Sequence, residues 1–151
     1  MKHRIYLAAL LLAVSTTIAR AEDIRACAFV VKARCASGDA RVTLADGVVK
    51  RVEVNVVWCG LHGYGYTCTI DASRGDRDSV WSDDRGGTLI ANASPWNPAQ
   101  PDRVRVSVGR TVLIDFAEAQ SLGRCGAGAE LPRTIVIPAQ KGACRVRLGA
   151  P

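Results

Sequence analysis

The sequence predicts an all-β fold, an antiparallel β-sandwich or barrel of about eight short strands with at most one short helix. Three observations predict it. Apolar and polar residues alternate along several segments, an Asp-Gly pair joins two of these segments, and six cysteines follow an apolar N-terminal stretch. Period-two alternation is typical of half-buried strands. We therefore expect a β domain that disulfides stabilise.

The strongest local signal is a hairpin around Asp46-Gly47, which separates residues 41–44 from residues 48–59. A two-residue hairpin turn needs positive φ at its central residues, and Asp-Gly adopts that conformation readily. Apolar and polar residues alternate along the second segment, which predicts one buried face and one exposed face. The buried face would hold Val52, Val54, Val56 and Trp58, and the exposed face Arg51, Glu53 and Asn55.

The remaining chain contains further strand segments separated by turns. The stretch 94–101 holds three prolines, which cannot donate ladder hydrogen bonds, so we expect a long loop there. The Asp-rich segment 71–87 is expected to be mainly a polar loop, and residues 116–122 are the one helical candidate, ending at Gly123. The other predicted strands are residues 64–72, 88–93, 103–108, 111–117, 134–137 and 143–148.

The N-terminus has the three parts of a secretory signal peptide: basic Lys2 and Arg4, an apolar run over residues 5–18, and Ala19-Arg20-Ala21. A transmembrane anchor would need about 20 apolar residues, and lipidation of Cys27 would leave an odd number of cysteines. We expect cleavage after residue 21, which leaves residues 22–151 as a single secreted or periplasmic domain.

Charge argues against nucleic acid as a partner. The formal net charge of the whole chain is +6, and removing Lys2, Arg4 and Arg20 with the leader lowers it to +3. Basic residues in the rest of the chain alternate with apolar ones, as in the stretches 103–106 and 145–148. This pattern predicts solvated strand faces rather than a phosphate-binding patch. Neither nucleic-acid binding nor a membrane span is expected.

The six cysteines are expected to form three disulfides: Cys27, Cys35, Cys59, Cys68, Cys125 and Cys144. No CxxC pair is present and an extracytoplasmic compartment oxidises thiols, so we expect neither a metal nor another cofactor. If residues 27–35 form one strand, the two sulfurs at its ends lie about 26 Å apart. A disulfide needs Cα atoms within about 7 Å, so Cys27 cannot pair with Cys35.

The favoured local bridge is Cys59–Cys68, because three of the eight intervening residues are glycines and permit a tight loop. Cys27 and Cys35 would then tie the first strand to Cys125 and Cys144, in an order that spacing does not assign.

Two patterns are candidates for catalysis or metal binding. His62 is the one histidine after the leader, and its glycine neighbours predict an exposed turn rather than a catalytic triad. Asp76 and Asp78 lie in the Asp-rich segment 71–87, where paired carboxylates could serve a hydrolase or bind calcium. Interleaved arginines favour a third interpretation, a polar loop with local ion pairs.

Aromatic residues concentrate between residues 58 and 96. Aromatic side chains on loops are common anchors for sugar rings and for hot spots of a protein partner. We therefore expect a binding module, a class that includes inhibitors, whose partner is an extracytoplasmic protein or polysaccharide. A structural envelope protein and a carboxylate-dependent hydrolase remain as alternatives. The expected binding residues, drawn from three loops, are His62, Tyr64, Tyr66, Asp76, Asp78, Trp81 and Trp96.

Overall fold

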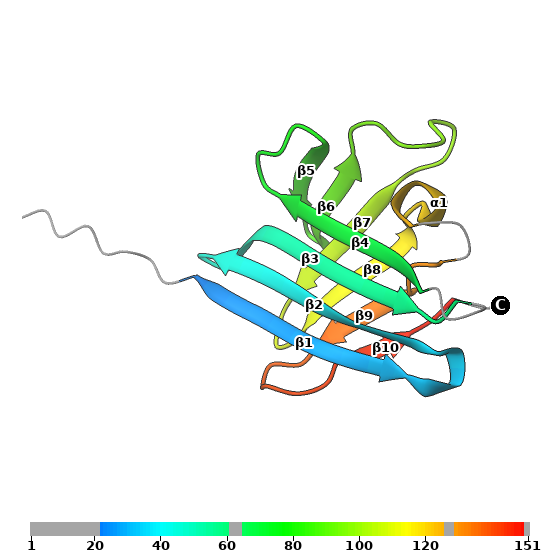
Figure 1. Ribbon diagram of the computed structural model, residues 1–151. Coiled ribbons are helices and arrows are strands. Elements are labelled where there is room, and N and C mark those ends of the chain that lie inside the picture. The colour runs from blue at the N-terminus through cyan, green and yellow to red at the C-terminus, as the bar shows by residue number, and fades with distance from the viewer. Residues whose placement is uncertain (1–21, 61–64, 126–128, 150–151) are drawn as a thin grey trace, which may run out of the picture.

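The computed structural model describes residues 22–60, 65–125 and 129–149. Two antiparallel β-sheets face each other, and apolar side chains from both form one core (Figure 1). The predicted all-β class is confirmed, with ten strands in place of the expected eight or so. The expected leader, residues 1–21, lies outside the described residues.

The first sheet has four strands, and strands consecutive in the chain are hydrogen-bonded neighbours. Its order is β1 (Asp23–Val31), β2 (Ala36–Ala45), β3 (Val48–Trp58) and β4 (Tyr66–Ser73). The 3₁₀ turn η1 (Lys32–Arg34) joins the first two strands.

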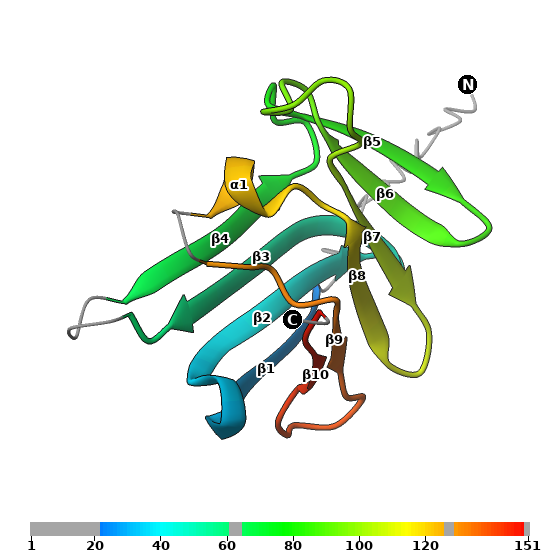
Figure 2. The ribbon, with the colours of Figure 1, turned by 90° about the vertical axis from the view of Figure 1, so that its right-hand side faces the viewer.

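The second sheet has six strands, again with consecutive strands as neighbours. Its order is β5 (Ser79–Asp84), β6 (Gly87–Asn92), β7 (Arg103–Val108), β8 (Val112–Glu118), β9 (Thr134–Ile137) and β10 (Arg145–Arg147). The one-turn helix α1 (Ser121–Arg124) lies beside β4, while the β5–β6 hairpin extends away from the first sheet (Figure 2).

The β2–β3 hairpin forms as predicted. Asp46 and Gly47 have φ values of 55° and 75°, the left-handed conformation that a tight mirror-image turn requires. The predicted inner face of β3 is also confirmed, because Val52, Val54 and Val56 are buried. These valines pack in one core with buried residues of the second sheet.

Trp58 lies at the end of that inner face and is half-buried against the core. Its indole Nε1 donates a hydrogen bond to the Glu130 carbonyl oxygen at 2.9 Å. A tryptophan at the rim of a core can satisfy its N–H group while burying its ring. The prediction that Trp58 faces the core is therefore confirmed.

The Asp-rich segment differs from its prediction. β4 continues to Ser73, and β5 pairs with β6 through contacts such as Trp81 with Ile90. β5 is an edge strand and none of its six residues is fully buried. The usual alternation between apolar and polar residues is therefore weak, which explains why this strand was expected to be a loop.

The predicted helix over residues 116–122 is also wrong. β8 continues through Glu118, with Phe116 buried in the core, and helix α1 begins only at Ser121. Phe116 follows the strand alternation of Val112 and Ile114, which are likewise buried. A short apolar run is compatible with either helix or strand, and here the pairing of β8 with β7 and β9 decides for the strand.

All six cysteines form disulfides, but the favoured Cys59–Cys68 pairing is wrong. Cys35 bonds to Cys59, because β1 ends at Val31 and a 3₁₀ turn returns the chain beside the end of β3. Cys68 bonds instead to Cys125, which follows α1. Cys27 bonds to Cys144, one of the two partners that the sequence left open for it. The exclusion of Cys27–Cys35 is confirmed.

Candidate functional site

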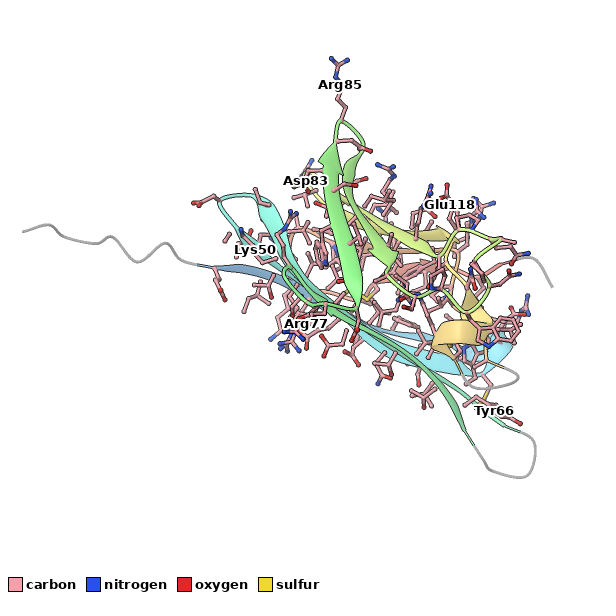
Figure 3. All side chains as sticks on the ribbon, turned by 90° about the horizontal axis from the view of Figure 1, so that it is seen from above. Lys50, Tyr66, Arg77, Asp83, Arg85 and Glu118 are labelled. Atoms are coloured by element: carbon pink, nitrogen blue, oxygen red, sulfur yellow. A yellow bond between two sulfur atoms is a disulfide. The ribbon has the colours of Figure 1, made fainter. Side chains whose placement is uncertain are left out.

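The expected binding residues that the structure describes lie on separate elements. Tyr66 begins β4 at one end of the first sheet, far from Asp83 and the β5–β6 hairpin (Figure 3). Trp81 lies within β5, and Trp96 lies in the loop between β6 and β7. His62 and Tyr64 lie outside the described residues.

Trp81 is packed rather than presented to solvent. Its ring is half-buried against the core, and its Nε1 donates to the Ser79 hydroxyl at 2.7 Å. The Arg74 guanidinium carbon lies 5.1 Å from the ring centroid, a cation–π contact. These contacts secure the edge of the second sheet and leave only part of the ring accessible.

Asp76 and Asp78 lie in the exposed turn between β4 and β5. Asp76 Oδ2 accepts a hydrogen bond from the Ser73 backbone N–H at 2.7 Å, which closes the turn. In the part of the chain that the structure describes, no group of three His, Cys, Asp or Glu residues is arranged to hold a metal. The Asp76 side chain therefore has a role in turn geometry.

The carboxylates of β5 form ion pairs with arginines. Asp84 lies 2.7 Å from Arg105 Nη1, and this hydrogen bond, aided by the Gly86 backbone N–H, lowers the pKa of Asp84 below its ordinary value. Asp83 has a lowered pKa through hydrogen bonds from Arg74 and Thr88. Opposite charges and hydrogen bonds both favour the ionised form of a carboxyl group.

This arrangement predicts an acid-sensitive contribution to stability. A carboxyl whose folded-state pKa is lowered stabilises the fold above its unfolded-state pKa, and the contribution disappears as pH falls through the folded-state value. Asp84→Asn is therefore expected to lose less unfolding free energy than the wild type between about pH 6 and about pH 3. Urea unfolding at both pH values measures this, with the exposed Asp78→Asn as control. Equal pH dependence in all three proteins would contradict it.

A groove of about 400 Å³ lies where the β6–β7 loop meets the end of β8 and helix α1. Trp96 and Leu122 both line it, and each is 68% exposed. An exposed tryptophan and an exposed leucine on one groove form an apolar contact surface. The other lining residues are Gln100, Pro101, Ala117, Glu118, Ala119, Gln120 and Ser121.

Gln120 holds the Trp96 loop in place. Its side-chain oxygen accepts from the Asn97 N–H at 2.9 Å, and its Nε2 donates to the carbonyl oxygens of Asn97 and Gln100 at 2.8 and 2.7 Å. One buried amide side chain thus fixes the loop at two points. The backbone that carries Trp96 is therefore held in one position by side-chain hydrogen bonds.

A buried ion pair fixes helix α1 behind the groove. Asp102 Oδ1 accepts hydrogen bonds from the Gln120 N–H at 3.0 Å and from Arg124 Nε at 2.8 Å. The Asp102 side chain is 1% exposed and that of Arg124 is 13% exposed. The Cys68–Cys125 disulfide ties the end of the same helix to β4. Leu122 is thereby presented from a helix held on both sides.

The groove combines apolar and polar side chains. Apolar Trp96 and Leu122 supply contact area, while Gln100, Glu118 and Ser121 supply hydrogen-bonding groups around them. Sequence reasoning found Trp96 but missed Leu122, Gln120 and Asp102. The partners in the hydrogen-bond network of Gln120 and Asp102 lie 18 to 23 residues apart in the chain, so no local pattern predicts it. The one sequence signal is the pair of polar residues that flank Pro101.

Comparisons with protein-family models, with curated proteins and with solved structures found no match. Across the described residues, no helix has both the length and the apolar character needed to cross a membrane. The three disulfides are typical of a protein outside the reducing cytosol.

Proposed function

We propose that this chain is an exported binding module that recognises an extracytoplasmic protein through the groove around Trp96 and Leu122. The observation that carries the proposal is the exposure of both side chains on a support fixed by Gln120, Asp102 and a disulfide. Large exposed apolar side chains on preorganised backbone are the usual anchors of protein interfaces. The proposal includes cleavage of the leader expected over residues 1–21 and release of the domain into a secreted or periplasmic space. Three disulfides support a location outside the reducing cytosol.

A protein partner is favoured over a polysaccharide because Leu122 is as exposed as Trp96. Sugar rings stack on aromatic faces, whereas an aliphatic side chain gains most from contact with other apolar side chains. The polar residues Gln100, Glu118 and Ser121 would form the hydrated rim of the interface. A polysaccharide is the alternative that the same experiment tests.

We expect Trp96→Ala to weaken binding by roughly 30-fold, the effect of losing about 2 kcal/mol at one hot spot. Adding Leu122→Ala to the Trp96→Ala protein should weaken binding further. The partner is first captured from envelope extract, then purified and titrated against each variant by calorimetry, in parallel with purified cell-wall polysaccharides. The Tm of Trp96→Ala should change by less than about 4 °C, because most of the indole is in solvent.

Val80→Ala is the matched control, since Val80 is 61% exposed on β5 and does not line the groove. It should bind like the wild type. Binding that survives both Trp96→Ala and Leu122→Ala would overturn the proposed surface. If the wild type bound polysaccharide and no protein, and Trp96→Ala abolished that binding, the proposed surface would stand and the ligand would be a polysaccharide.

A further inference from the structure

The three disulfides differ sharply in their exposure to solvent. Cys27 and Cys144 are both buried, and in the second bridge Cys68 is buried while Cys125 is half-buried. In the third bridge, Cys35 and Cys59 are both exposed. Thiol–disulfide exchange requires a thiolate to reach one of the sulfur atoms, so exposure decides which bridge reacts without unfolding.

The exposed bridge is also the one that the fold needs least. Cys35 and Cys59 flank strands β2 and β3, which pair directly through Ala36 and Trp58. The Cys59 N–H donates to the Cys35 carbonyl oxygen at 2.9 Å, so the backbone closes the same loop as the sulfur atoms. The buried bridges instead join segments from opposite sheets or from α1 to β4. Opening Cys35–Cys59 therefore leaves the hairpin paired.

The surroundings of this bridge favour exchange chemistry. A groove of about 570 Å³ is lined by Cys35 and Cys59 together with apolar residues such as Val30 and Val57. Lys32 is the one charged residue among the described residues that line it. A nearby cation stabilises a thiolate and makes the sulfur a better leaving group. The groove also gives an attacking thiol room to approach.

We propose that Cys35–Cys59 is a reversible thiol–disulfide exchange site that a dithiol reductant opens while the fold persists. A reductant thiolate attacks Cys59 Sγ, forming a mixed disulfide, and the bond to Cys35 breaks with its electron pair leaving as the Cys35 thiolate beside Lys32. The second thiolate of the reductant then attacks the reductant's first sulfur in the mixed disulfide, and the Cys59 thiolate leaves. Both cysteines take up the protons that the dithiol lost, and the dithiol becomes a disulfide by losing two electrons. This site is independent of the Trp96 groove.

The test is a timed reduction of the folded, oxidised protein with dithiothreitol. Samples are quenched with an alkylating reagent, and peptide mass spectrometry locates the modified cysteines. We expect Cys35 and Cys59 to be modified at least about tenfold faster than the other four, because each of the other bridges has at least one buried cysteine and requires local opening. Near-ultraviolet circular dichroism should remain native during this first phase. Equal rates for all three bridges, or loss of the native spectrum with the first pair, would overturn the proposal.

Lys32→Glu tests the assigned leaving group without removing a cysteine. Reversing this charge should slow the first phase by roughly threefold or more, because the departing Cys35 thiolate then faces a carboxylate. Lys50→Glu is the matched control, since Lys50 is exposed on β3 and does not line the groove. It should reduce at the wild-type rate. An unchanged rate in Lys32→Glu would overturn the assignment of Cys35 as the leaving sulfur.

Discussion

Arg124→Met is expected to lower the free energy of unfolding by about 3–5 kcal/mol, the usual effect of removing one partner from a buried ion pair. Asp102 Oδ1 would keep only the hydrogen bond from the Gln120 N–H, and Asp102 Oδ2 already has no hydrogen-bond partner within the described structure. The carboxylate would then be buried with little compensation for its lost hydration. Methionine retains much of the length and apolar stem of arginine, so the variant mainly removes the charge and its hydrogen bond.

Urea unfolding followed by tryptophan fluorescence measures this loss. Arg103→Met is the matched control, because Arg103 pairs with Glu118 across 3.5 Å while the two side chains are 50% and 55% exposed. Exposed pairs contribute little, so this variant should lose under about 1 kcal/mol. A loss in Arg124→Met as small as that in Arg103→Met would show that another group compensates the Asp102 carboxylate.

The same variant connects stability to the proposed binding surface. The Asp102 carboxylate holds both the backbone of Gln120 and the side chain of Arg124, so its environment sets the position of α1 and the Trp96 loop together. A protein with this pair broken should present Trp96 and Leu122 less rigidly. Stability and affinity at the groove are therefore expected to fall together, whereas Trp96→Ala should change affinity alone.

Local signals in the sequence predicted the parts of the fold that depend on local physics. Asp46-Gly47 specifies its turn through the φ values that those two residues tolerate. Val52, Val54 and Val56 mark a buried face because side chains of one strand alternate between its two sides. Both features depend only on neighbouring residues, so they can be recognised without knowing the rest of the fold.

Features that depend on distant residues were missed. β5 carries no clear alternation because it is an edge strand, and its existence follows from pairing with β6. Cys35 reaches Cys59 only because η1 interrupts the strand predicted through residue 35. The Gln120 clamp likewise depends on loop atoms of Asn97 and Gln100, about 20 residues earlier in the chain. A sequence pattern of short period cannot report such contacts.

The largest contribution of a single covalent link is expected from Cys27–Cys144. Replacing both cysteines with alanine should lower the free energy of unfolding by about 5 kcal/mol, because this bridge spans 117 residues and restricts the unfolded chain most. The Cys35→Ala, Cys59→Ala protein is the matched control, with a separation of 24 residues and an expected loss of about 3.5 kcal/mol. Urea unfolding of both variants gives the order directly.

The position of Cys27–Cys144 predicts where the folded protein should loosen as well. β1 is an edge strand of the first sheet, and β10 is an edge strand of the second and has only three residues. The bridge and the hydrogen bond from the Cys144 N–H to the Ala28 carbonyl oxygen, at 3.0 Å, connect these two edges. Without the sulfur link, amide exchange should accelerate first in β10 and then in β1, while the β2–β3 hairpin stays protected. Uniform acceleration through both sheets would show instead that the bridge acts only on the unfolded chain.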